Sequence, residues 1–164
     1  MAPHIRPLTE HDADDVLRIN EASVHHLAPM GPDELTWFLV HAACAWGVEV
    51  DDELAGFVLV LPPGLDYASD NYRWFSARYD RFTYLDRVAL DERHRRQGIG
   101  SVLYDAVEAE AHGRGGPLLL EVNVRPANEA SLAFHDARGY VEVGTLAHDG
   151  GAKVVRLLEL APPT

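Results

Sequence analysis

The chain has 164 residues, close to the length of one ordinary domain; 47% of them are hydrophobic and 24% are charged. These proportions are typical of globular proteins and exclude an intrinsically disordered chain. Lysine and arginine number 14 against 26 aspartate and glutamate residues, and the resulting net charge of −12 disfavours nucleic acid and anionic membranes as partners.

The cysteine content and the hydropathy of the chain exclude further classes of protein. Cys44 is the only cysteine, so neither a disulfide within the chain nor a zinc-finger spacing is available. The longest apolar runs, such as residues 57–61, are far shorter than the roughly 20 residues of a membrane span, and residues 1–10 lack the apolar run of a signal peptide. The histidines at 25, 26 and 41 have no partners at metal-ligand spacing. We therefore expect one cytoplasmic domain over 1–164, with no metal and no membrane contact.

The first third of the chain predicts a strand, two helices and a hairpin. Residues 4–8 are typical of a short strand, and the acidic residues at 10–15 favour the N-terminus of a first helix. A second helix is predicted from Pro32, because the apolar residues that follow it recur with a period of about 3.6 residues. Residues 46–50 and 54–60 flank an acidic turn and predict an antiparallel hairpin.

The rest of the chain alternates strands and helices. Residues 62–81 form a long connection rich in aromatic side chains, and such connections usually have a function or a structure of their own. A strand at 82–90, a helix from Ile99 and a buried strand at 118–124 predict a parallel βαβ unit. A further helix is expected at 128–138, followed by two strands at 140–146 and 153–160. The predicted fold is thus a mixed sheet with helices packed on it.

One segment carries a clear chemical signal, Arg95-Arg96-Gln97-Gly98-Ile99-Gly100-Ser101, between a predicted strand and a helix. A helix N-terminus has unpaired N–H groups and a partial positive charge, and glycine lets a ligand approach the backbone. Leu103 stands where a dinucleotide fingerprint needs a further glycine, and the Gly-Lys-Ser/Thr of a Walker loop is absent. These residues alone support a phosphate site and an ordinary turn with solvated arginines equally.

The helix at 128–138 has two different faces. Its apolar stripe consists of Ala130, Ala133, Phe134 and Ala137. The opposite side carries Asn128, Ser131, Leu132 and His135. Without further context, this second side is a solvent face on which Asn128 is the N-cap and His135 has no role.

Residues 84–144 resemble the GNAT superfamily of acetyl-CoA-dependent N-acetyltransferases. Val88-Ala89-Leu90 followed by Arg95-x-x-Gly98-x-Gly100 resembles the strand and pyrophosphate loop of that family. The helix motif Asn128-x-x-Ser131-x-x-Phe134-His135-x-x-x-Gly139-Tyr140 is similar to its Asn-x-x-Ala-x-x-Phe-Tyr-x-x-x-Gly-Phe helix. The resemblance implies a GNAT-like α/β (α+β) fold: a mixed, mostly antiparallel sheet with a central splayed parallel βαβ pair and helices on both faces.

The resemblance also implies acetyl-CoA as cosubstrate and a role for each matching residue. Val88 and Leu90, on either side of Ala89, would offer backbone groups to the pantetheine arm, and an N–H near Val88 would polarise the thioester carbonyl. Arg95 and Arg96 would supply charge to the pyrophosphate. The backbone amides that hold it would be those of Gln97, Gly98, Ile99, Gly100 and Ser101.

Two further coenzyme contacts are implied on the helix at 128–138. Asn128 would touch the coenzyme arm. Position 135, often a tyrosine in the family, would hold the acid that protonates the leaving thiolate. This chain has His135 there, and an imidazolium is also a competent proton donor.

Attack by an amine also requires a base. A lysine-like amine has an ordinary pKa of about 10.4 and is mostly protonated at pH 7, so a carboxylate or a water relay must remove a proton. Glu121 stands where family members that acetylate protein N-termini carry a base, and it is the preferred candidate. Asp86 on the preceding strand is the second. Both carboxylates have a structural alternative: Asp86 can pair with Arg87, and Glu121 can be buried beside an arginine.

The sequence therefore predicts an N-acetyltransferase that moves the acetyl group of acetyl-CoA to a primary amine by direct attack. The acceptor is open: a small molecule, or the N-terminus or a lysine of a protein. The alternative is a catalytically weak coenzyme-A-binding regulatory or sensor module, for which the departure at His135 leaves room. The aromatic residues from Tyr67 to Phe82 are candidates for lining the acceptor site or a homodimer interface.

Overall fold

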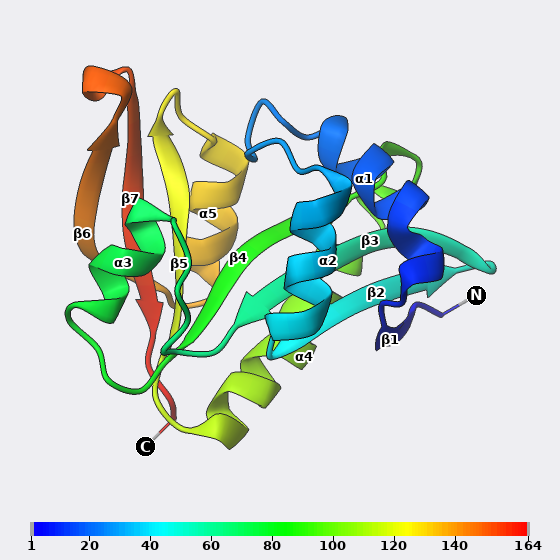
Figure 1. The fold of residues 1–164 in the computed structure, drawn as a ribbon, viewed down its shortest axis with the longest axis horizontal. Helices are drawn as coiled ribbons and strands as arrows, with labels where there is room; N and C mark the ends of the chain where they lie inside the picture. The colour runs from blue at the N-terminus through cyan, green and yellow to red at the C-terminus, as the bar shows by residue number, and fades with distance from the viewer. Residues whose placement is uncertain (1, 164) are drawn as a thin grey trace. The chain divides into compact units, whose positions relative to one another are not determined.

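The structure, a computed structural model, describes residues 2–163 (Figure 1). Within this range the strands are β1 (His4–Pro7), β2 (Cys44–Val50), β3 (Glu53–Leu61), β4 (Thr83–Leu90), β5 (Leu118–Arg125), β6 (Val141–His148) and β7 (Lys153–Leu160). The α-helices are α1 (Ala13–Glu21), α2 (Pro32–His41), α3 (Asp70–Ser76), α4 (Ile99–Arg114) and α5 (Glu129–Ala137). The 3₁₀ turns are η1 (Glu10–Asp12), η2 (Glu92–His94) and η3 (Asp149–Gly151). Every predicted element is present, and α3 is an addition inside the long connection.

The strands hydrogen-bond in the order β1-β2-β3-β4-β5-β7-β6. The pairs β1–β2, β2–β3, β5–β7 and β6–β7 are antiparallel, whereas β4 and β5 are parallel. The parallel ladder joins only Thr83 to Leu118 and Tyr84 to Leu119, a short contact for two strands of eight residues. These pairings confirm the mixed, mostly antiparallel sheet with a central parallel pair.

The chain divides into two compact units, and β4 contributes to both. Unit 1 comprises the residues up to Leu61 together with Leu85–Glu110. Unit 2 comprises Pro62–Tyr84 and the residues from Ala111 onward. Each unit is described by itself.

In unit 1, helices cover both faces of the strands. Figure 1 shows α1 and α2 in front of β2 and β3, with α4 behind them. The buried side chains follow the helical period that the sequence displays: Ile19 in α1, Phe38 in α2, and Ile99 and Leu103 in α4 are at most 2% exposed.

The entry to α1 is fixed by Asp12. Its carboxylate accepts hydrogen bonds from Arg6 Nη1 and Nη2, both at 2.8 Å, and from Thr9 N at 2.8 Å. The Thr9 side chain in turn accepts from His11 N. Thr9 and Asp12 together form a capping box at the start of η1. The hydrogen bonds from Arg6 hold the pKa of Asp12 below its ordinary value.

Replacing Asp12 by asparagine is expected to lower the free energy of unfolding at pH 7 by about 1–3 kcal/mol, because the hydrogen bonds from Arg6 lose their charged acceptor. A carboxyl whose pKa is depressed by folding stabilises the protein above its ordinary pKa, here 3.8, and loses that contribution as the pH falls through the folded value. Urea unfolding from pH 7 down to pH 3 should therefore show the difference from the parent shrinking below about pH 4.

The matched control is Asp15→Asn. Asp15 is 55% exposed and contacts only the half-exposed Arg18 at 3.3 Å, so its loss should change stability little at any pH. A difference for Asp12→Asn that stays constant down to pH 3 would contradict the assignment.

In unit 2, the aromatic connection builds a core around α3. Tyr72 and Phe75 are at most 1% exposed, and their rings lie 5.4 Å and 5.8 Å from that of Tyr84 on β4. The Tyr72 hydroxyl donates to Pro62 O at 2.7 Å and accepts from Leu65 N at 3.1 Å. The expectation that this segment as a whole lines an acceptor site or a dimer interface is wrong for Tyr72 and Phe75, because both are interior residues of unit 2.

Candidate functional site

The predicted pyrophosphate loop, residues 95–101, joins η2 to α4 in unit 1. Arg96 and Gly98 have left-handed backbone, with φ of 63° and 76°. This turn lets α4 begin at Ile99, and Gly98 O accepts a hydrogen bond from Val102 N at 3.2 Å. The N–H groups of the first helical turn have no acceptor within the helix. The loop therefore presents donors and the positive end of the helix dipole, as an anion site requires.

Both glycines of the loop leave open space above the backbone. A Cβ added to Gly98 would meet no heavy atom within 4 Å, and one added to Gly100 would meet only Leu90 Cδ1, at 3.8 Å. The left-handed φ of Gly98 explains that glycine by itself. Gly100 has neither a positive φ nor a steric requirement within the chain. A ligand that approaches the backbone there would account for it.

Arg95 and Arg96 are the cations of this loop. Both side chains are exposed, and across residues 2–163 neither is paired with an aspartate or glutamate. Arg18, Arg87 and Arg93, in the same unit, all form ion pairs. In a chain with a net charge of −12, two arginines without carboxylate partners at a helix N-terminus make a local positive site.

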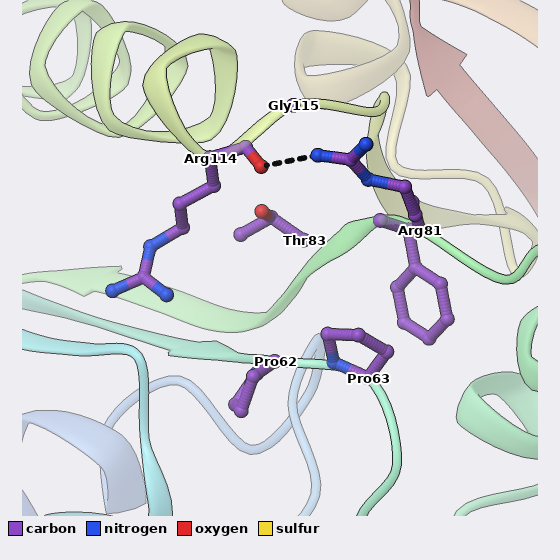
Figure 2. Close-up of a pocket in the computed structure, with 7 residues that line it drawn as sticks. Pro62, Pro63, Arg81, Thr83, Arg114 and Gly115 are labelled. Carbon is purple, nitrogen blue, oxygen red and sulfur yellow. Dashed lines mark hydrogen bonds between the residues drawn. The ribbon is translucent and has the colours of Figure 1, made fainter.

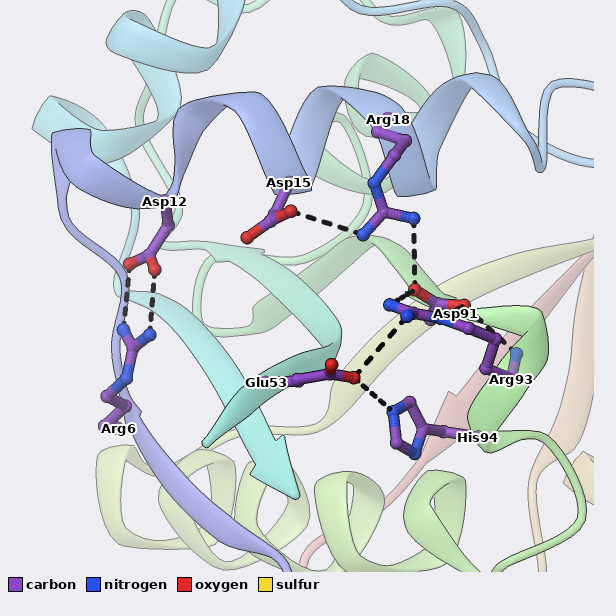
Figure 3. A network of polar contacts seen from close by, with 8 residues as sticks. All are labelled: Arg6, Asp12, Asp15, Arg18, Glu53, Asp91, Arg93 and His94. Atoms are coloured by element: carbon purple, nitrogen blue, oxygen red, sulfur yellow. Dashed lines mark hydrogen bonds and ion pairs between the residues drawn. The ribbon is translucent and has the colours of Figure 1, made fainter. Parts of the chain in front are cut away.

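A buried carboxylate holds the start of the loop (Figure 3). Asp91 accepts from Arg93 N at 3.0 Å, from Arg93 Nη2 at 3.0 Å and from Arg18 Nη1 at 3.1 Å. The hydrogen bonds from Arg93 keep the pKa of Asp91 far below its usual range. Asp91 N donates to Ala55 O at 2.8 Å, which ties the end of β4 to β3.

Figure 3 also shows Glu53, whose Oε2 lies 3.6 Å from both Arg93 Nη1 and His94 Nε2.

The predicted pantetheine strand lies just before this network. Ala89 is buried, and Val88 and Leu90 are half-buried. A Cβ at Gly56 of β3 would come within 2.8 Å of Ala89 O and 2.7 Å of Leu90 Cδ2, so only glycine permits this approach. Sequence reasoning missed Gly56, although an isolated glycine inside an apolar strand is a signal of close backbone approach.

Asp86 forms the structural ion pair that the sequence left open. Its Oδ2 accepts from Arg87 Nε at 2.8 Å, and both side chains are 6% exposed. Arg87 Nη1 also donates to Asn20 Oδ1 and to Ala28 O, each at 3.1 Å. The Asp86 charge is therefore matched by a buried guanidinium, which makes it a weaker candidate for the base.

Glu121 is placed differently, on β5 of unit 2. It is half-buried, and its Oε1 accepts a hydrogen bond from the hydroxyl of Tyr84. Tyr84 is 1% exposed and is fixed by the rings of Tyr72 and Phe75. The partner of Glu121 in this pair is thus a tyrosine, where the sequence had suggested an arginine. Tyr84 was not identified as a site residue from the sequence, because its contact with Glu121 depends on the register of two parallel strands.

The structure reverses the expected orientation of α5. Ala130, Ala133 and Ala137 are exposed, whereas His135 is buried, with 4% exposure. The interpretation of His135 as a residue on a solvent face is wrong. The reason is size: alanines give little apolar area, so the larger imidazole is buried instead, while Ser131 and Leu132 on the same side are half-buried.

The His135 ring is held in a defined orientation. Its Nδ1 lies 2.7 Å from Ser131 O and 3.3 Å from Ser131 Oγ, and the ring packs edge-on against Tyr140 at 5.1 Å. Because the Ser131 carbonyl can only accept, Nδ1 carries a hydrogen in this contact. Asn128 caps α5, with Oδ1 accepting from Ser131 N at 3.3 Å.

Residues 2–163 contain neither a candidate metal cluster nor a candidate membrane-spanning helix. Histidine, cysteine, aspartate and glutamate side chains do not gather there in threes or more in a way that could hold a metal ion. None of the helices in that range combines the length and apolar character needed to span a membrane.

Comparison with known proteins places this geometry in a family. The sequence profile of the acetyltransferase (GNAT) family matches residues 13–140. No curated protein matches the chain. Among solved structures, Ard1 from Thermoplasma volcanium is similar over 100% of both chains, with 20% identity and a TM-score of 0.79.

Two further solved structures are similar to this chain at comparably low sequence identity. The ribosomal-protein-S18-alanine N-acetyltransferase from Escherichia coli has 19% identity and a TM-score of 0.70, covering 99% of this chain and 96% of its own. Arabidopsis thaliana NAA60, solved in complex with acetyl-CoA, has 16% identity and a TM-score of 0.75, covering 98% and 99%. At such identities the likeness shows the fold.

Proposed function

Because the chain belongs to the GNAT acetyltransferase family, we propose that it is an N-acetyltransferase that moves the acetyl group of acetyl-CoA to a primary amine by direct attack. One observation carries the proposal most strongly. Among residues 2–163, the loop at 95–101 combines a helix N-terminus, two arginines without carboxylate partners and a glycine, Gly100, that no described contact requires. An anionic ligand such as a pyrophosphate accounts for all three features.

The residues present fit the coenzyme. Arg95, with Arg96 beside it, supplies charge to the pyrophosphate, and the amides of 97–101 donate to its oxygens. The β4 residues 88–90 bind the pantetheine arm through their backbone. Asn128 uses Oδ1 for its cap, and its side-chain nitrogen has no partner in the described part of the chain, so it remains available as a donor.

The reaction needs one base and one acid. In the proposed reaction Glu121 accepts a proton from the amine, whose nitrogen then forms a bond to the carbonyl carbon of the thioester. The carbon–sulfur bond breaks, the thiolate takes a proton from the imidazolium of His135, and the new amide nitrogen releases its second proton to solvent. Tyr84 positions the Glu121 carboxylate through its hydrogen bond. The net charge of −12 favours a cationic acceptor, either a small amine or the N-terminus or a lysine of a protein.

The coenzyme assignment is tested by Arg95→Ala. Its affinity for acetyl-CoA, measured by calorimetry, should fall by about tenfold or more, because a charge-assisted hydrogen bond is lost. S-acetylpantetheine has no pyrophosphate, so the affinity of the variant for this ligand should fall much less. Arg73→Ala is the matched control, since Arg73 is exposed and has no described partner. Equal losses for both ligands would show that Arg95 does not contact phosphate.

The transfer reaction is tested separately. Release of free coenzyme A is followed with a panel of amines that includes polyamines, amino acids and peptides with different N-termini. Turnover with one class of amine is the expected result and identifies the acceptor. Tight acetyl-CoA binding without turnover on any amine would contradict the proposed N-acetyltransferase activity. It would favour the coenzyme-binding sensor module.

A further inference from the structure

A cavity of about 230 Å³ lies in unit 2, and none of the residues that line it has been assigned to the coenzyme or to the reaction (Figure 2). One side is apolar and consists of Pro62, Pro63 and Phe82. The other carries Arg81, Thr83 and Arg114, while no aspartate or glutamate lines the cavity. Figure 2 shows Arg81 and Arg114 approaching from opposite sides, with Thr83 between them and the two prolines below.

The Arg81 guanidinium, on an exposed residue, is oriented by one hydrogen bond. Its Nη2 donates to Arg114 O at 3.2 Å, and a Cβ at Gly115 would overlap the same group. Arginine has five N–H donors. In residues 2–163 the remaining donors of Arg81 have no acceptor, so the side chain is oriented but largely unused.

Thr83 provides the second polar group. The residue is 1% exposed, and its hydroxyl has no hydrogen-bond partner among the residues that the structure describes. Its backbone N–H is used, donating to Pro117 O at 3.0 Å. The hydroxyl oxygen keeps some solvent contact at the cavity, where it can donate a hydrogen bond to a ligand.

These features select the ligand chemistry. A guanidinium binds a carboxylate through two parallel hydrogen bonds, and a threonine hydroxyl can donate a third. The prolines and Phe82 suit an apolar body. The volume is below the roughly 300–1,000 Å³ of sites for drug-sized ligands, so the ligand must be small. We propose that this cavity binds a small organic carboxylate, with its carboxylate on Arg81 and Thr83 and its apolar part against Pro62, Pro63 and Phe82.

Benzoate is a suitable probe, and benzamide is its neutral counterpart of similar shape. Calorimetric titration of the full chain should detect benzoate, with a dissociation constant of about 1 mM or below, and much weaker benzamide binding. Arg81→Gln should weaken benzoate binding by about tenfold or more. Arg73→Gln, an exposed arginine outside the cavity, should leave it unchanged.

Thr83→Val keeps the shape and removes only the hydroxyl. Because that hydroxyl has no partner, the variant should retain or increase the free energy of unfolding while losing benzoate affinity by about threefold or more. Three outcomes would overturn the proposal. They are no benzoate binding at about 10 mM, equal binding of benzoate and benzamide, and unchanged affinity in both folded variants.

Discussion

Replacing Gly100 by valine is expected to weaken acetyl-CoA binding by up to about a hundredfold while the protein stays folded. The position has no positive φ, and a Cβ there would meet only Leu90 Cδ1 at 3.8 Å, an ordinary contact. Valine is also a better helix former than glycine. The folded protein therefore has room for the valine side chain. The same side chain would clash with bound acetyl-CoA. Crowding of this kind costs about 1–3 kcal/mol, or up to about a hundredfold in affinity.

The same helix provides the control. Gly113 also lies in α4, has no positive φ, and a Cβ there would meet nothing within 4 Å. Gly113→Val should bind acetyl-CoA like the parent. Calorimetry gives the affinities, and urea unfolding confirms that both variants are folded. Unchanged acetyl-CoA affinity in a folded Gly100→Val variant would show that the loop does not hold the coenzyme.

The parts of the fold that the sequence predicts best are those with strong periodicity. The continuous apolar run at 118–124 predicts β5, and Leu118, Leu119 and Leu120 are all buried. The stripe beginning at Ile99 predicts α4, and the glycine pattern between β4 and α4 predicts the loop. In each case local pattern and tertiary position agree, because the apolar residues of one element are enough to define its buried face.

The failures arise where the deciding contact is not local. α3 is short and lies in a segment without a clear period, and its buried aromatic residues are fixed by tertiary contacts such as that between Tyr72 and Tyr84 on β4. The buried side of α5 is set by what packs against it, and its own alanines carry too little apolar area to decide. Asp91 contacts Arg18, which lies 73 residues away, so no window of sequence reveals that network.

The candidate site shows the same contrast between residues predicted from local patterns and residues that depend on non-local contacts. Motif spacing predicts the loop residues and proposes Glu121, but it cannot separate Glu121 from Asp86 as the base. Their described partners differ: a buried arginine on Asp86 and a tyrosine hydroxyl on Glu121. A neutral hydroxyl lowers the proton affinity of a carboxylate less than a guanidinium does, and this difference is why we propose Glu121 as the base.

Glu121→Gln is therefore expected to lower turnover with the amine acceptor by about 10²–10⁴-fold at pH 7, the usual contribution of a general base. The loss should shrink as the pH rises toward about 10.4, the ordinary pKa of a lysine-like amine, because the acceptor then loses its proton without help. Affinity for acetyl-CoA should be unchanged. Tyr84→Phe keeps the ring and removes only the hydroxyl, so we expect a smaller fall in kcat with a similar pH profile.

Asp86→Asn provides the contrast. It leaves Arg87 buried without its carboxylate, which should cost about 3–5 kcal/mol in the free energy of unfolding. If Asp86 is structural, turnover per folded molecule should follow the parent pH profile, because no proton acceptor has been removed. The opposite pattern would assign the base to Asp86: a loss in Asp86→Asn that recovers at high pH, with turnover intact in Glu121→Gln. If both variants keep the parent profile, the amine loses its proton to water, and the tyrosine–glutamate pair only holds β4 against β5.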